Sequence, residues 1–264
     1  MNMRRISAAV TRIWGQLNSR LVRLMWARPG YTQPLRLGTA YGGWHCYAEL
    51  LHPGDVALCI GAGEDVSFDV ILNARYGQHV VCVDPTPRAV THVHELLHAH
   101  ADGRTIPIGG IGSTSYALEC FESERFKLVP CAVWSSDTKL DLYLPQDSTH
   151  VSLSAVNLQG TESTITVQAL RIETILRDLQ LAEIALLKMD IEGAEYEVLA
   201  DLLVSHVYPR QLLVEFEDFN RPRNIFFLPR ILKMLRRLRL AHYQLRHVEG
   251  ANFLFSLQTM GRRA

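Results

Sequence analysis

The chain has 264 residues, with 27 lysines and arginines against 27 aspartates and glutamates, so its formal net charge at pH 7 is zero. This length suits one well-buried α/β domain with extensions and excludes two large independent cores. The balanced charge removes the usual electrostatic reason to expect a nucleic-acid partner.

The first predicted element is a basic amphipathic helix within residues 6–24, where apolar residues recur at helical spacing between arginines. Seven arginines and no acidic residue precede Glu49. No apolar run there is long enough for a signal peptide or a membrane span. We expect residues 1–37 to form a helical extension that packs on the domain or on a second copy in a homodimer. Contact with a membrane surface is the alternative.

The five cysteines form no C-x-x-C pair, and three of them lie in apolar runs that resemble strands. They are Cys46, Cys59, Cys82, Cys120 and Cys131. Thiols in such positions are typical of a reduced core. The pattern therefore predicts a cytoplasmic protein.

From residue 53 onward, apolar strand-like runs alternate with helical segments. Residues 55–63 predict a strand that ends in glycines, 66–77 a helix closed by Gly77, and 79–87 a second strand stopped by prolines. Further strands are predicted at 126–134, 139–145, 184–190 and 211–216, helices at 194–203 and 230–240, and a closing hairpin at 244–248 and 252–257. This alternation predicts a mostly parallel sheet flanked by helices, with the hairpin as an antiparallel edge.

The polar segment 144–164 is predicted to be either a long loop over the site or an inserted hairpin. Ser152, Ser154 and Asn157 lie in it and could order a polar substrate, although such residues are also ordinary in loops.

Ligands of open parallel sheets bind outside the carboxyl ends of the strands, so the residues just past each strand are the candidates. Past the first strand, the glycines of the run Gly61-Ala62-Gly63-Glu64-Asp65 would let backbone amides approach a ligand closely. Asp84 follows the next strand, at the spacing of the acid that binds the ribose hydroxyls of an adenosine cofactor. Together they predict a nucleoside ligand. A tight turn, with Asp84 capping the helix near Pro87, is the alternative.

Two further strand ends carry carboxylates. Asp190 is followed by Glu192, with Lys188 inside the same strand, and Glu215 ends the next strand. Such carboxylates could accept a proton from an attacking hydroxyl or bind a divalent cation, although we assign no metal. They would repel one another unless a proton, a cation or Lys188 intervened. Glu195, in contrast, is expected only to favour the start of the following helix.

The runs "LLKMDIEGAEYEVL" and "QLLVEF" resemble the signature of the FkbM-type S-adenosylmethionine-dependent methyltransferases, and "GEDVSFD" with "VDPTPRAV" resembles a first cofactor motif of that family. The resemblance extends from about Gly38 to about residue 257. It implies a class I, Rossmann-like methyltransferase fold over residues 38–264. It also implies S-adenosylmethionine held by Gly61, Gly63 and Asp84, and methylation of a hydroxyl on a sugar, glycan or secondary metabolite.

The sequence departs from the family pattern at two positions. Cys59 stands where most members have an acid, so Glu64 and Asp65 are the alternatives for the methionine amino group. Glu217 stands where a histidine often follows the "VEF" run. Trp134 could stack on an adenine or fill the sheet edge. Residues 41–44, Tyr-Gly-Gly-Trp, could form a wall of the site or only pack against the domain.

Three other interpretations stay open at this level. An NAD-dependent oxidoreductase would share the glycine loop and Asp84, and an inactive S-adenosylmethionine-binding subunit would share the whole cofactor site. The run His94-Glu95-Leu96-Leu97-His98 has the H-E-x-x-H spacing of zinc peptidases. Because it lies within the βαβ unit without an obvious third ligand, a solvated histidine-rich helix is favoured.

Overall fold

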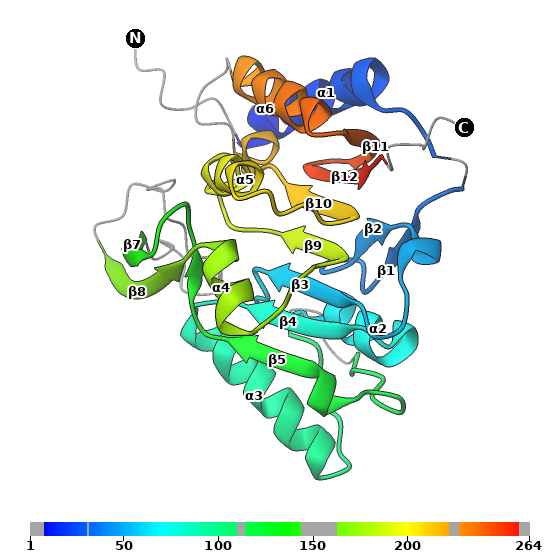
Figure 1. Cartoon of the computed structure of the whole chain (residues 1–264), viewed down its shortest axis with the longest axis vertical. Coiled ribbons are helices and arrows are strands. Elements are labelled where there is room, and N and C mark those ends of the chain that lie inside the picture. The colour runs from blue at the N-terminus through cyan, green and yellow to red at the C-terminus, as the bar shows by residue number, and fades with distance from the viewer. Residues whose placement is uncertain (1–7, 31, 110–113, 144–162, 222–226, 259–264) are drawn as a thin grey trace.

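The computed structural model describes residues 8–30, 32–109, 114–143, 163–221 and 227–258. A central sheet with helices on both faces forms the body of the molecule, and a smaller sheet extends from one side (Figure 1). The predicted sites Ser152, Ser154 and Asn157 lie outside the described residues.

The helices cover the sheet or lie against its edges. They are α1 (Ala8–Trp26), α2 (Ser67–Tyr76), α3 (Pro87–Ala101), α4 (Ile172–Asp178), α5 (Glu195–Val204) and α6 (Leu228–Leu240), with short 3₁₀ helices η2 (Ala48–Leu50), η3 (Ser123–Arg125) and η4 (Glu217–Phe219).

The strands are distributed over three sheets. They are β1 (Leu35–Leu37), β2 (Trp44–Cys46), β3 (Val56–Ile60), β4 (His79–Val83), β5 (Phe126–Val129), β6 (Ala132–Val133), β7 (Thr138–Tyr143), β8 (Thr164–Leu170), β9 (Leu186–Met189), β10 (Gln211–Glu215), β11 (Tyr243–Glu249) and β12 (Asn252–Leu257).

The central sheet has the order β11-β12-β10-β9-β3-β4-β5. Strands β5, β4, β3, β9 and β10 run parallel, whereas β12 pairs antiparallel with both β10 and β11. The inner parallel strands β3, β4, β9 and β10 are short, mostly apolar runs buried on both faces, as sheets covered by helices require, whereas the edge strand β5 is only partly buried. The chain leaves β3 for β4 on one side and reaches β9 on the other, so the switch point lies between β3 and β9.

Local sequence explains where several elements begin and end. Helix α2 ends at Gly77, which adopts the left-handed conformation with φ +62° and closes the helix with its backbone N–H. Helix α3 starts with Thr86, whose hydroxyl accepts a hydrogen bond from the Ala89 amide, followed by Pro87 in the first turn. The mixed α/β architecture with a mostly parallel central sheet is confirmed and is consistent with a Rossmann-like methyltransferase fold.

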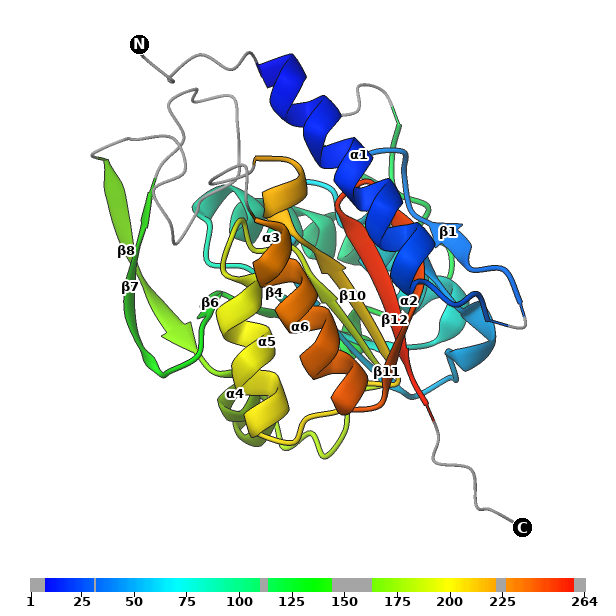
Figure 2. The same ribbon diagram turned by 90° about the horizontal axis from the view of Figure 1, so that it is seen from above.

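The structure contains elements that the sequence patterns did not predict. Strand β8 was not predicted; it pairs antiparallel with β7, which matches the strand predicted at 139–145. It also pairs in parallel with β6, which lies in the segment predicted as a strand at 126–134, and the three strands form the small sheet. Helix α4 follows β8 directly. A two-stranded sheet, β1 with β2, precedes the central sheet. Helix α1 packs beside β11 and η4 (Figure 2). The predicted division at residue 37 stays a prediction.

Candidate active site

The carboxyl edge of the central sheet gathers the predicted polar residues into one row. Gly61, Asp84 and Asp190 each follow the last residue of neighbouring parallel strands, and Glu215 ends β10. Backbone bonds hold the row together, because the Gly61 amide donates to Val83 and the Asp190 amide donates to Ile60. The register of the strands therefore fixes the order of these groups across the edge.

A cavity of about 1020 Å³ opens along this row. The residues predicted to bind the cofactor or to act in catalysis line it, with the exception of Trp134: Gly61, Ala62, Gly63, Glu64, Asp65, Asp84, Lys188, Asp190, Glu192 and Glu215. Its volume is close to the upper limit of the range of about 300–1000 Å³ that is typical of sites for small ligands and cofactors.

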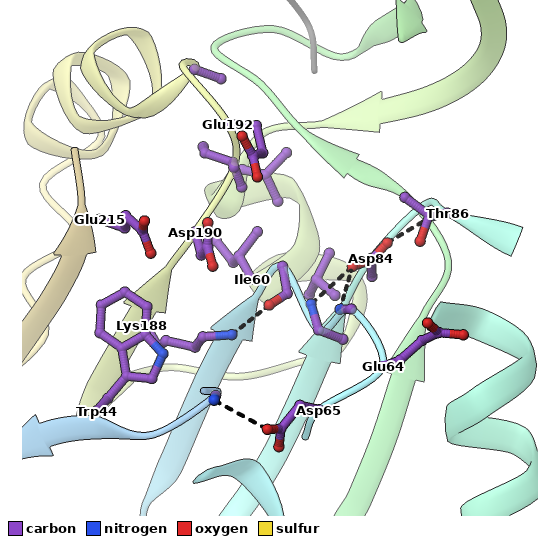
Figure 3. A pocket seen from close by; sticks show the side chains of 18 of the residues that line it. Trp44, Ile60, Glu64, Asp65, Asp84, Thr86, Lys188, Asp190, Glu192 and Glu215 are labelled. Atoms are coloured by element: carbon purple, nitrogen blue, oxygen red, sulfur yellow. Dashed lines mark hydrogen bonds between the residues drawn. The ribbon is translucent and has the colours of Figure 1, made fainter. Parts of the chain in front are cut away.

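The glycine loop after β3 is held by hydrogen bonds to Asp84 (Figure 3). One carboxylate oxygen, Oδ2, accepts the amides of Ala62 at 2.8 Å and Gly63 at 3.1 Å, and the other, Oδ1, accepts the Thr86 amide at 2.8 Å. Two of the loop amides therefore point at a protein carboxylate, whereas the sequence suggested that they face a ligand. Asp84 does not cap α3, because Thr86 does.

Gly61 cannot carry a side chain in this arrangement. Its φ is +82°, and an added Cβ would lie 1.9 Å from the carbonyl oxygen of Asp190. The missing side chain thus allows the main chains after β3 and β9 to approach each other closely.

The side chains of Glu64 and Asp65 make contacts within the protein. Glu64 pairs with Arg88 at 2.6 Å. Asp65 accepts hydrogen bonds from the Thr39 hydroxyl at 2.5 Å, the Gly42 amide at 3.1 Å and the Ser67 amide at 3.0 Å. Asp65 therefore fastens the loop between β1 and β2 to the start of α2, beside the cavity.

Lys188 lies in the interior beneath the glycine loop, only 4% exposed. Its ammonium donates a hydrogen bond to the Gly61 carbonyl and lies 5.7 Å from the centre of the Trp44 ring. Burial alone would lower its pKa, but Asp69, and after it Asp190, raise the pKa above its ordinary value. Asp69 is fully buried, and neither of its oxygens has a hydrogen-bond partner among the described residues. The sequence suggested that the positive charge of Lys188 balances the carboxylates at the strand ends, but in the structure its main electrostatic partner is Asp69, with Asp190 second.

Asp190 and Glu215 share a crowded environment of negative charge at the floor of the cavity (Figure 3). Burial, then Glu215 and then Glu192, raise the pKa of Asp190 well above its usual range, against the opposing effect of Lys188. Burial, then Glu217 and Glu192, raise the pKa of Glu215 to about 7. A carboxylate such as Glu215, with a pKa of about 7, holds or releases a proton near neutral pH, which suits general acid–base chemistry.

Glu195 differs from the sequence expectation. It does begin α5, but it is 1% exposed, and its Oε1 accepts the Gly193 amide at 2.6 Å. Its Oε2 is buried without a hydrogen-bond partner among the described residues. Burial raises its pKa to about 8, so it is a buried acid and not a solvated residue at a helix start.

A scan against protein families matches residues 55–245 with the Methyltransferase FkbM domain. The match covers most of the chain and includes the glycine loop, Asp84 and the carboxylates after β9 and β10. The chain belongs to the FkbM methyltransferase family. Comparison with curated proteins gave no significant match.

The cavity of this FkbM methyltransferase includes polar residues that the sequence patterns missed. They are Arg36, Asn220, Glu249 and Asn252. Asn252 pairs with Glu215 across the sheet and with Glu249 in β11, so the polar row continues onto β12 and β11. Asn252 starts an antiparallel strand, and a search of strand ends alone therefore passes over it.

Of the aromatic residues predicted near the site, Tyr41 and Trp44 line the cavity and Trp134 does not. Tyr41, Gly42 and Trp44 line the cavity, so this stretch forms part of its wall. Trp134 is not among the lining residues, and its amide donates to Leu170 at 2.9 Å in the small sheet. The corresponding stretch of the wall comes from residues 131–133 just before it.

The H-E-x-x-H run lies within α3, and neither His94 nor His98 is among the residues that line the cavity. His94 and His98 are exposed, and their ring centres are 6.5 Å apart. Throughout the described ranges, no group of three or more histidine, cysteine, aspartate or glutamate side chains could hold a metal ion. The exposure of His94 and His98 agrees with the interpretation of α3 as a solvated histidine-rich helix. None of the described helices is both long and apolar enough to cross a bilayer.

Proposed function

We propose that the protein transfers a methyl group from S-adenosylmethionine to a hydroxyl group of a sugar, glycan or secondary-metabolite acceptor. The observation that carries this proposal is the placement of Asp190 and Glu215, with raised pKa values, beside the glycine loop in one cavity of about 1020 Å³. Membership of the FkbM family supports methyl transfer in general.

The described residues fit the cofactor. Gly63 has φ +57° and no atom within 4 Å of an added Cβ, so the loop leaves open space above it. Asp84 lies 5% exposed at the adjacent strand end, where its carboxylate can accept hydrogen bonds from ribose hydroxyls in addition to the loop amides. Bound S-adenosylmethionine supplies an electrophilic methyl group on a positively charged sulfur. Residues 131–133 offer apolar surface for the adenine.

The acceptor needs its hydroxyl aligned with the methyl group and relieved of its proton during attack. Asp190 is our choice as the base, since it lies next to the glycine loop, and Glu215 and Glu192 adjust its proton affinity. Asn220 donates hydrogen bonds to Glu215 and to Glu217, which orients the carboxylate of Glu215. The amide and carboxylate groups at the β10–β12 end of the cavity suit an acceptor with several hydroxyls.

Calorimetric titration with S-adenosylmethionine and with NAD tests the cofactor assignment. We expect binding of S-adenosylmethionine, weakened by about 1–3 kcal/mol in Asp84→Ala through the loss of hydrogen bonds. Binding of NAD in place of S-adenosylmethionine would contradict the proposal.

A methyl-transfer assay with isotopically labelled cofactor and a panel of sugars, glycans and hydroxylated metabolites tests the reaction. Asp190→Asn should keep cofactor affinity and lower turnover about a hundredfold or more. Glu197→Gln, on the surface of α5 with a side chain 42% exposed, is the matched carboxylate-to-amide control and should keep full turnover. Full turnover in Asp190→Asn would show that this residue is not the base. Cofactor binding without transfer to any acceptor would favour an inactive binding subunit.

A further inference from the structure

Helix α1 packs against the domain with its small and polar side. Among the positions of the helix whose burial is described, 13–26, the buried ones are Gly15, Asn18, Ser19 and Val22. Gly15 lies so close to η4 that an added Cβ would be 1.8 Å from the carbonyl oxygen of Phe219. This contact fixes the rotation of the helix about its own axis. Most of its described large apolar side chains therefore point away from the domain, whereas Val22 and the partly buried Trp26 pack against the core.

The outward side of α1 forms a continuous apolar face, which we define by Ile13, Trp14, Leu17, Leu21, Leu24 and Met25. These side chains are between 42% and 78% exposed. Among the described residues, six of the eleven exposed large apolar side chains lie on this one helix. Single exposed apolar residues are ordinary, but a contiguous face of this kind marks a surface that meets an apolar partner.

Cationic side chains border the apolar face. At 100° per residue, Arg20 and Arg23 lie along one side of it, and both are exposed. Helix α6 covers the same end of the sheet beside β11 and exposes Lys233, Arg236 and Arg239 (Figures 1 and 2). Neither helix contains an aspartate or a glutamate.

We propose that the apolar face of α1 docks on an anionic lipid surface, with the arginines and lysine of α1 and α6 meeting lipid phosphates. Helices that lie in a membrane interface combine these features: a broad apolar face, basic flanks and an aromatic residue such as Trp14. A second copy of the chain is the other apolar partner that such a face suits. In such a dimer, the arginines and lysine of α1 and α6 from both copies would lie close together, and neither helix has a carboxylate to pair with them.

A short 3₁₀ helix links the docked helix to the candidate active site. Helix α1 touches η4, and η4 comes directly after β10, whose last residue Glu215 lines the cavity. The inference does not depend on the identity of the methyl acceptor.

Co-sedimentation of the whole chain with phosphatidylcholine vesicles, with and without phosphatidylglycerol, tests this inference. Binding should be at least about tenfold tighter to the anionic vesicles and should weaken as salt is added. Leu17→Ser combined with Leu21→Ser should weaken binding at least about tenfold, because two apolar side chains no longer enter the interface. Arg20→Gln combined with Arg23→Gln should weaken binding about tenfold and flatten the salt dependence.

Val204→Ser is the control, since Val204 is 68% exposed but lies on α5. It should bind like the unaltered chain, and thermal melts should show that all variants keep the fold. Equal binding of the leucine variant, or equal binding to neutral and anionic vesicles, would overturn the proposal. It would also be overturned if light scattering without lipid revealed a dimer that the leucine variant converts to monomer, because the face would then be a contact between copies.

Discussion

The buried acid Glu195 makes a specific prediction about stability, opposite in sign to the one that its place at a helix start suggests. In the folded protein, burial raises its pKa to about 8 from an ordinary value of 4.5. The folded state therefore binds the Glu195 proton more tightly than the unfolded state does. Its effect on the free energy of unfolding is most favourable below pH 4.5 and is lost progressively as the pH rises to about 8.

The size of the effect follows from the shift. Each pH unit within that window costs about 1.4 kcal/mol, so the loss at pH 7.5 is at most about 4 kcal/mol. Glu195→Gln removes the ionisation and keeps an oxygen for the Gly193 amide, but it leaves a buried N–H₂ group that costs about 1 kcal/mol. We therefore expect the variant to be about 1–3 kcal/mol more stable than the unaltered chain at pH 7.5.

Denaturant unfolding at pH 5 and pH 7.5 measures this difference. The gain of Glu195→Gln should be small or negative at pH 5 and should appear at pH 7.5. Glu197→Gln, on the exposed side of the same helix, should change the free energy of unfolding by less than about 0.5 kcal/mol at both pH values. A Glu195→Gln variant that is less stable at pH 7.5, or a difference that does not change with pH, would refute the reasoning.

Three further predictions concern the cavity. Turnover should rise with pH through about 7, because burial raises the pKa of Glu215 to about 7 and a carboxylate must lose its proton before it can accept one. Glu215→Gln should shift the rising part of the pH–rate profile. An unchanged profile would contradict an electrostatic effect of Glu215 on the base. Lys188→Met should lower the free energy of unfolding by about 3 kcal/mol, because it leaves the buried Asp69 without its positive partner. Adding Asp69→Asn should recover part of the loss. A double-mutant cycle measured by denaturant unfolding tests this. Gly61→Ala should cost about 2–4 kcal/mol and abolish cofactor binding, since its Cβ would meet the Asp190 main chain; a normal thermal melt would show that the loop can move aside.

Much of the central sheet could be predicted because its strands carry strong local patterns. The runs that became β3, β4, β9 and β10 are apolar and bounded by glycine, proline or charge, so their length and ends are visible in the sequence. Their polar end residues could be predicted to meet for the same reason, because parallel strands end at one edge.

The elements that were missed depend on distant partners. Strand β2 has three residues, and the chain just after it is held by Gln211, whose side chain accepts the Tyr47 amide and donates to the Tyr47 carbonyl from 164 positions away. Strand β8 has an alternating pattern of its own, since exposed positions alternate with half-buried or buried ones in TITVQAL, but most of its inward positions are only half-buried and the run directly follows the polar segment 144–164. No local pattern specifies pairings of this kind.

The environments of single charged residues were the least predictable part of the site. Glu195 and Lys188 lie in segments whose secondary structure was expected correctly, yet the partners of both depend on how elements pack. Asp69 supplies the counter-charge of Lys188 from α2, and nothing in the spacing of the two residues indicates that they meet. The same is true of Asn252, whose place at the cavity follows from the antiparallel direction of β12.

The position of Lys188 under Gly61 also has a consequence for folding. The two residues are separated by 127 positions, and β3 obtains β9 as its second neighbour only through that distant segment. Strand β12, which lies between β10 and β11, comes later still. At a synthesis rate of about 5–20 residues per second, the open edge of β3 waits roughly 6–26 s for β9 to be made. During that interval its unpaired edge can join other chains, so a ribosome-bound fragment ending before residue 186 should depend strongly on chaperones.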